Sequence, residues 1–132
     1  MRLHIEVEVN PTESEEKVRK AILGIFGEVP IQVEATRNGS VLTVEVKGQN
    51  PLGTFRNILR RDHIRDAARR ALMHSLRGNV FAFCLNKQAA FAGHVSFSEA
   101  EAESPLGPIR VTVETGEPLS LVEWIAPKTA RD

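Results

Sequence analysis

Cysteine, tyrosine and long apolar runs are scarce or absent in this sequence of 132 residues. The single cysteine, Cys84, excludes an internal disulfide framework and any zinc site built from several thiolates. No apolar run approaches the roughly 20 residues that a membrane-spanning helix needs. Apolar and charged residues alternate directly after Met1, which is unlike a signal peptide. We therefore expect a cytoplasmic protein with no membrane partner.

Signatures of metal binding, cofactor binding and covalent catalysis are also missing. The histidines, at positions 4, 63, 74 and 94, show no metal-ligand spacing with one another or with Cys84. Ser40 and Ser104 lack the glycines of a nucleophile elbow, and no glycine pattern matches a phosphate loop or a dinucleotide fingerprint. We expect no metal, no cofactor and no catalytic residue, hence a protein that is not an enzyme. Only an unexpected pocket with converging polar groups would favour a small-molecule enzyme.

The first half of the chain predicts a strand, a helix and a hairpin. Hydrophobic residues make up 42% of the chain, which is enough for one core, so we expect a single domain over residues 1–126 and a frayed tail at 127–132. Alternation predicts a strand over residues 2–10. A helix that ends at Gly27 follows, with Thr12 and Glu15 at capping-box spacing.

Asn38-Gly39 predicts the turn of a hairpin, because this pair suits the positive φ angles of a type I′ turn. A two-residue loop there sets Arg37 opposite Ser40. The same register pairs apolar residues on one face of the hairpin. The predicted pairs are Ala35 with Leu42, Val33 with Val44 and Ile31 with Val46.

The second half begins with a long helical segment, from about Leu52 to Leu76, after the Asn50-Pro51 start signal. Its apolar stripe changes direction along its length. We infer either a break near residues 60–62 or a helix buried on different faces.

Strands are then expected over residues 80–85, 94–97 and 109–113, with a helical turn in the connector 86–93. The acidic stretch 98–103 and the stiff segment 104–108 predict the longest loop. A short helix over residues 118–125 would pack Leu121 and Trp124 against the core. This β-α-β-β-α-β order with further C-terminal strands predicts an α+β fold, an antiparallel sheet with helices packed on one face.

Charge is balanced over the whole chain, with 17 basic and 17 acidic residues, but it is unevenly distributed. Residues 54–77 hold seven arginines and two aspartates. Arginine pairs bidentately with phosphate and is never deprotonated. We therefore predict a phosphate-contacting surface on this segment. Its candidate residues are Arg60, Arg61, Arg65, Arg69, Arg70 and Arg77.

A polar run directly after the expected strand 80–85 adds three further candidates, Asn86, Lys87 and Gln88. Such a run can present an amide, an ammonium and backbone N–H groups to a phosphate or a base edge. The alternative is that Asn86 and Gln88 cap backbone groups where the chain turns. The arginines have an alternative of the same kind, a solvated face with ion pairs of Asp66 to Arg70 and Asp62 to Arg65.

The element order invites comparison with the RNA recognition motif, but the stacking residues of that motif are missing. His4 is the only ring expected in the first strand, and residues 41–47 have none. Recognition of a double-stranded backbone by its shape is the RNA-binding mode that remains. A protein-interaction or assembly module, in which an exposed face builds a homodimer, is the rival hypothesis.

Six segments of the sequence carry a resemblance to a known family. They are Arg56–Arg60, Gly78-Asn79, Phe83–Gly93, Val95–Phe97, Ser104–Ile109 and Trp124–Pro127. Together they resemble an uncharacterised archaeal family, number two-zero-one of the UPF series, which has RNA-binding or exosome-subunit-like relatives. The resemblance covers nearly the whole chain. It implies a fold like that of the ribosomal protein that binds five-S rRNA, and an RNA-associated role in translation or RNA processing.

Overall fold

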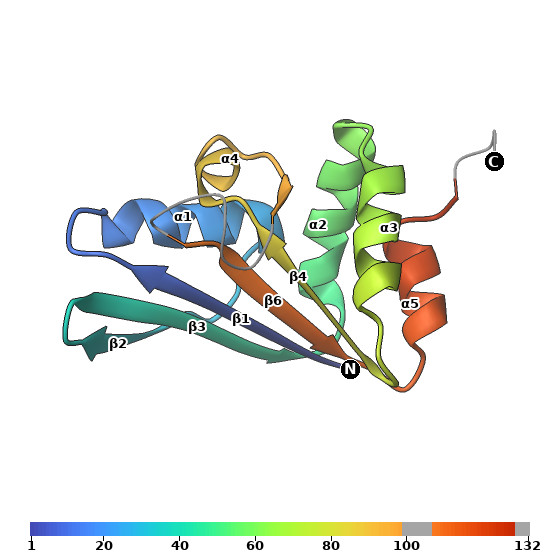
Figure 1. Ribbon diagram of the computed structural model, residues 1–132, viewed down its shortest axis with the longest axis horizontal. Coiled ribbons are helices and arrows are strands. Elements are labelled where there is room, and N and C mark those ends of the chain that lie inside the picture. The colour runs from blue at the N-terminus through green and yellow to red at the C-terminus, as the bar shows by residue number, and fades with distance from the viewer. Residues whose placement is uncertain (99–106, 129–132) are drawn as a thin grey trace.

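One antiparallel sheet organises the chain (Figure 1). The computed structural model describes residues 1–98 and 107–128. In this part the strand order is β2-β3-β1-β6-β4-β5, and each neighbouring pair is antiparallel. The strands are β1 (Arg2–Val9), β2 (Gln32–Thr36), β3 (Gly39–Lys47), β4 (Val80–Leu85), β5 (Phe97–Ser98) and β6 (Ile109–Glu114). The helices are α1 (Glu15–Phe26), α2 (Asn50–Arg61), α3 (Arg65–Ser75), α4 (Lys87–Phe91) and α5 (Pro118–Ile125). The predicted α+β architecture is confirmed.

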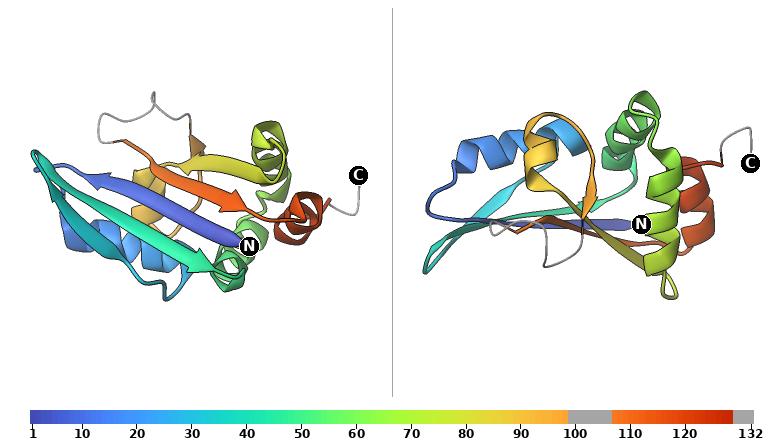
Figure 2. Two further views of the ribbon diagram at one scale, coloured as in Figure 1. Left: turned by 90° about the horizontal axis from the view of Figure 1, so that it is seen from below. Right: turned by 45° about the horizontal axis from the view of Figure 1, so that its top comes forward.

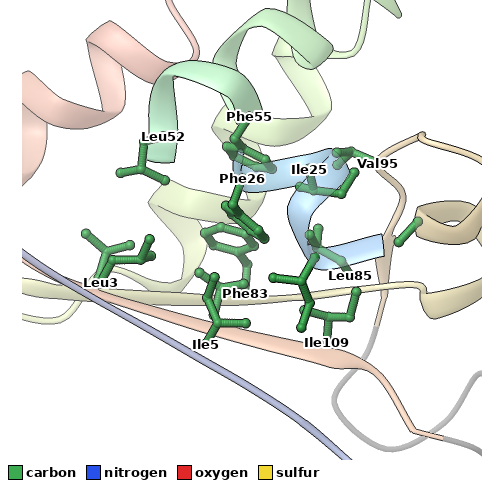
Figure 3. Packing of buried hydrophobic residues seen from close by; sticks show 14 of the residues in the cluster. Leu3, Ile5, Ile25, Phe26, Leu52, Phe55, Phe83, Leu85, Val95 and Ile109 are labelled. Atoms are coloured by element: carbon green, nitrogen blue, oxygen red, sulfur yellow. The ribbon is translucent and has the colours of Figure 1, made fainter. Parts of the chain in front are cut away.

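The core lies between the helices and one face of the sheet. Strand alternation places the odd-numbered residues of β1, β4 and β6 on this face, and they are buried. Phe26 of α1, Phe55 of α2 and Phe83 of β4 stack there, with ring centroids 5.7 and 5.3 Å apart (Figure 3). The other face is open: in the left view of Figure 2, α1 and α4 lie behind the sheet.

The long helical segment is broken into α2 and α3, as one of the two sequence alternatives predicts. The break falls at residues 62–64, where His63 takes a φ of +58°. Because the chain turns there, each half buries its own apolar stripe. Leu52, Phe55 and Leu59 are buried on α2, and Ala68 and Leu72 on α3.

The predicted register of the β2–β3 hairpin is wrong by two residues. Thr36 pairs with Gly39 and Val33 with Leu42, so the loop is Arg37-Asn38. Gly39 instead begins β3, with a φ of +141°, and a Cβ there would lie 2.1 Å from the carbonyl oxygen of Val9. The glycine is therefore required for close approach to the end of β1 rather than for the turn. A shift of two residues preserves the faces, because side chains alternate with a period of two.

Two smaller predictions also need correction. The cap of α1 is Ser14, whose Oγ accepts a hydrogen bond from the Lys17 N–H at 3.2 Å, rather than Thr12. The strand expected over residues 94–97 is limited to Phe97 and Ser98. Most of the predicted loop 98–108, and the end of the predicted frayed tail, lie outside the described residues. None of the helices in the described segments has the length and apolar character to cross a membrane.

Candidate nucleic-acid interface

Helix α5 packs between two rows of arginines. Arg56 and Arg60 are four residues apart on α2, and Arg65 and Arg69 are four residues apart on α3, so each pair shares one helix face. Arg56 and Arg69 both contact α5, which places both rows beside it. The sheet and helix arrangement in Figure 1 brings α2, α3 and α5 together at one end of the molecule.

The two inner arginines hold α5 in place. Arg56 Nε donates to the Trp124 carbonyl oxygen at 2.7 Å, and its guanidinium lies 5.2 Å from the centroid of the Trp124 ring. Arg69 Nη1 donates to Glu123 Oε2 at 2.6 Å and to the Ala126 carbonyl oxygen at 3.1 Å. The hydrogen bond from Arg69 holds the pKa of Glu123 below its usual value. These two side chains are therefore structural, and their charges are used within the protein.

The two outer arginines, Arg60 and Arg65, flank the corner between α2 and α3 on the α5 side. Arg60 is exposed and Arg65 is half-buried. Neither guanidinium has a hydrogen-bond or ion-pair partner within residues 1–98 and 107–128. Lys128, just beyond α5, is exposed, and its backbone bonds Glu123. The corner thus presents Arg60 and Arg65, which we call the corner cations.

The guanidinium groups of Arg61 and Arg77 donate hydrogen bonds to other groups of the chain. Arg61 donates to both carboxylate oxygens of Asp62, at 2.9 and 3.1 Å, and to the carbonyl oxygen of Gly93 at 2.8 Å. Asp62 also bonds His94 at 2.9 Å. Arg61 first, and His94 second, hold the pKa of Asp62 far below its usual range. Arg77 donates to the backbone carbonyl oxygens of His74 and Leu76.

Arg61, Arg65 and Arg69 are spaced four residues apart, as on one face of a continuous helix, but they do not share a face because the helix breaks after Arg61. The predicted ion pairs of Asp66 with Arg70 and Asp62 with Arg65 are also absent from the described part of the chain. Arg70 is exposed and has no side-chain partner there. Five residues separate it from Arg65, so it lies about 140° around α3 from the corner cations.

Lys87 is buried, which removes it from the surface on which it was expected. Its side chain is 1% exposed, and its Nζ donates to the Glu8 carbonyl oxygen at 2.8 Å and to Glu13 Oε1 at 3.0 Å. Glu13 Oε1 also accepts from the backbone and side-chain nitrogens of Asn10, both at 3.0 Å. Burial acts to raise the pKa of Glu13, but these hydrogen bonds outweigh it and lower the pKa.

Asn86 and Gln88 flank Lys87, and they differ in which interpretation of the polar run they support. Asn86 is the N-cap of α4, and its Oδ1 accepts from the Ala89 N–H at 2.9 Å, as the capping alternative predicts. Gln88 is exposed. Figure 1 places α4 beside α1, away from α3 and α5, so this polar run does not join the corner cations.

The open face of the sheet is acidic, and the only aromatic ring that the described residues place on it is the imidazole of His4, whose Nδ1 lies 2.6 Å from Glu45 Oε1. The register places the even-numbered residues of β1, β4 and β6 on it, together with the odd-numbered residues of β3. Its charged members are Glu6, Glu8, Glu34, Glu45 and Glu114 against Arg2, Lys47 and Arg110. Some of these charges pair across strands, as Arg2 does with Glu114 at 3.3 Å. Both the excess of carboxylates and the scarcity of rings disfavour base stacking on this face.

Sequence reasoning missed the role of α5 in this site. The spacing of Arg56 with Arg60 was visible, but the sequence does not say that Trp124 and Glu123 would bond the inner arginines. Lys128 carried no signal beyond its charge. In the described residues no group of three or more His, Cys, Asp or Glu side chains is placed to hold a metal ion.

Comparison with known proteins identifies the family. A family model described as RNA binding matches residues 2–115. A UPF0201 protein of Sulfurisphaera tokodaii is 45% identical over 98% of this chain and 90% of its own length. One of Pyrobaculum aerophilum is 38% identical over 99% and 92%.

Solved structures agree with these relatives. The crystal structure of the UPF0201 protein from Methanococcus jannaschii has a TM-score of 0.86 and 32% identity, and it covers 98% of this chain and 95% of that one. A second UPF0201 crystal structure has a TM-score of 0.82 and 33% identity, with the same coverage. The chain therefore belongs to the UPF0201 family of archaeal proteins, whose matching model is described as RNA binding.

Proposed function

We propose that this protein binds structured RNA without catalysis, and that the corner cations contact the phosphate backbone. The observation that carries the proposal is the position of Arg60 and Arg65, on one side of the α2–α3 corner and without an internal partner. Guanidinium groups in that state are available for bidentate pairing with phosphate oxygens. The family description of RNA binding agrees with this chemistry.

The proposed site is compatible with the net charge of zero over the whole chain. Phosphate contacts supply most of the sequence-independent affinity for nucleic acid, and they require local rather than global positive charge. The acidic open face of the sheet repels a phosphate backbone, so the RNA is directed to the helical end. Because the described part of the open face offers only the His4 ring, which contacts Glu45, we propose that a double-stranded backbone is read by its shape.

The test is a salt titration with a fluorescent duplex RNA, measured by fluorescence anisotropy. We expect the double variant Arg60→Glu/Arg65→Glu to lose at least about tenfold in affinity. Its plot of log affinity against log salt should be shallower by about two, because each phosphate contact contributes about 0.9 to the slope. Both residues lie outside the core, so the circular dichroism spectrum should not change.

The matched control is Arg37→Glu/Arg110→Glu, which makes the same change in net charge on the hairpin loop and the open sheet face. This control should bind within about twofold of the wild type once salt reaches about 150 mM, because distant exposed charges are then screened. Equal losses in both double variants would refute the corner cations as the site. The homodimer stays a separate prediction, which light scattering with and without RNA would check.

A further inference from the structure

A groove of 870 Å³ lies between α3 and the edge of the sheet formed by β4 and β5. Its volume is within the range of small-molecule sites, roughly 300–1,000 Å³. The side of α3 that lines it carries Arg70, Ala71 and His74, which is not the side that faces α5. The groove is therefore separate from the corner cations.

An added peptide strand cannot pair with the edge of β4 in this groove, because all but one of the main-chain groups on that edge already have hydrogen-bond partners. Val80 exchanges two hydrogen bonds with Arg77, at 2.9 and 3.1 Å. The N–H of Ala82 donates to Ser75 Oγ at 3.1 Å, and Cys84 pairs with Ser98 of β5. The carbonyl of Ala82 points to the same side as its N–H and has no donor in the described part of the chain. One acceptor is thus left on this edge.

The groove has an apolar wall. Phe97 is half-buried and meets Phe83 edge to face, with ring centroids 5.8 Å apart. Met73 on the α3 side is 40% exposed, although it is a large apolar side chain. A flat apolar molecule would cover these side chains and remove their surface from water. Ser98 adds a polar group, since its Oγ is buried and has no hydrogen-bond partner.

Cationic and titratable side chains lie on the helical side of the groove. The guanidinium of Arg70 has no partner among the described residues. His74 follows one turn later on the same face, and both line the groove. An anionic group bound here would gain a charge-assisted hydrogen bond from Arg70.

We propose that this groove binds a nucleotide. The phosphate lies at Arg70 and His74, the base covers Met73 and Phe97, and a donor on the base edge bonds the Ala82 carbonyl oxygen. The groove thus offers an anion site, an apolar wall and a neutral acceptor, which are the kinds of group that a phosphate, a base face and a base-edge donor would contact. Two sources share this chemistry, a free mononucleotide and an unstacked nucleotide of a bound RNA. The second source rests on the proposed function, whereas the first does not.

The experiment is a titration of the 15N-labelled protein, followed by two-dimensional NMR, with each of the four ribonucleoside 5′-monophosphates. Adenosine and inorganic phosphate are titrated in parallel. We expect saturable shifts of groove amides with at least one monophosphate, and weaker binding of adenosine and phosphate. Arg70→Gln should weaken binding about tenfold, because it removes a hydrogen bond from a charged group. Ala71→Phe, which fills the groove from α3, should abolish binding.

Arg37→Gln is the matched control, since it removes one exposed arginine from the β2–β3 loop, at the opposite edge of the sheet, and should leave the affinity unchanged. If the monophosphates do not bind but a short single-stranded RNA shifts the same amides, with dependence on Arg70, the source is RNA. Absence of groove shifts with every nucleotide and oligonucleotide would overturn the proposal. So would inorganic phosphate binding as tightly as the monophosphates. Neither result would affect duplex binding by the corner cations, which Arg60→Glu/Arg65→Glu tests separately.

Discussion

Lys87 and the corner cations show two opposite uses of positive charge in one chain. Lys87 is enclosed between β1, α1 and α4, where Glu13 and the Glu8 carbonyl oxygen bond its ammonium group. Arg60 and Arg65 flank the α2–α3 corner without a carboxylate partner in the described residues. A buried charge must be paired because desolvation is costly, whereas an exposed guanidinium stays hydrated. Burial therefore explains why Lys87 must be paired, whereas among the arginines the presence or absence of a bonding partner in the chain separates the structural cations from the candidate ligand-binding ones.

The largest expected effect follows from breaking the buried pair. Lys87→Met leaves the carboxylate of Glu13 buried without its ammonium partner, so we expect a loss of about 3–5 kcal/mol in the free energy of unfolding. Urea denaturation at pH 7 measures it. Lys20→Met, on the exposed face of α1, should change stability by less than about 0.5 kcal/mol.

A second substitution, made together with Lys87→Met, tests whether the unpaired buried charge causes this loss. In Glu13→Gln/Lys87→Met no buried charge remains, so the double variant should recover part of the stability lost in Lys87→Met. An unfolding free energy of Lys87→Met equal to that of the wild type would show that the Glu13–Lys87 pair contributes nothing, and the contrast with the corner cations would fail.

A smaller effect distinguishes inner from outer arginines. Arg69→Leu removes the hydrogen bond to the Ala126 carbonyl oxygen, and we expect a loss of about 1 kcal/mol. Arg65→Leu, one turn earlier on α3, should stay within about 0.5 kcal/mol of the wild type. Thermal denaturation gives both values, and hydrogen exchange of α5 amides should rise in Arg69→Leu alone. Equal losses in the two variants would contradict the division into structural and free arginines.

The smallest expected effect is on the loss of folding stability at low pH. Because the folded protein holds the pKa of Glu13 below its usual value, the ionised carboxylate stabilises the fold above the unfolded pKa of about 4.3. That stability is lost as pH falls from there through the lower, folded pKa. Glu13→Gln should therefore lose less stability between pH 6 and pH 3 than the wild type does, measured by urea denaturation at each pH. Glu34→Gln, an exposed residue of β2, is the control. An identical pH dependence in Glu13→Gln and wild type would contradict this account.

Part of the candidate site could be predicted from the sequence alone. The excess of arginine in residues 54–77 indicated the region, and the change of direction in its apolar stripe gave the break that separates Arg61 from Arg65 as one of two alternatives. The sequence did not predict which of these arginines would lack a bonding partner among the described residues. That depends on Glu123 and Ala126, which are more than 50 residues away in sequence and lie beside α3 only after α5 packs.

The hairpin shows the same limit on a local scale. Asn38-Gly39 correctly indicated a turn between two strands, because glycine and asparagine tolerate unusual backbone angles. The position of the turn was decided by the contact of Gly39 with Val9, a residue of another strand. Local turn preference was outweighed by the close approach of two backbones.

The sequence by itself determined the secondary structure order, the buried faces of β1, β4 and β6 and the concentration of arginine, because these depend on local periodicity and composition. Tertiary structure alone decided the burial of Lys87, the pairing of Arg56 and Arg69 with α5, and the groove beside β4. The physical reason is that the energy of a charged side chain depends on its solvation and its partners, and both are set by residues distant along the chain.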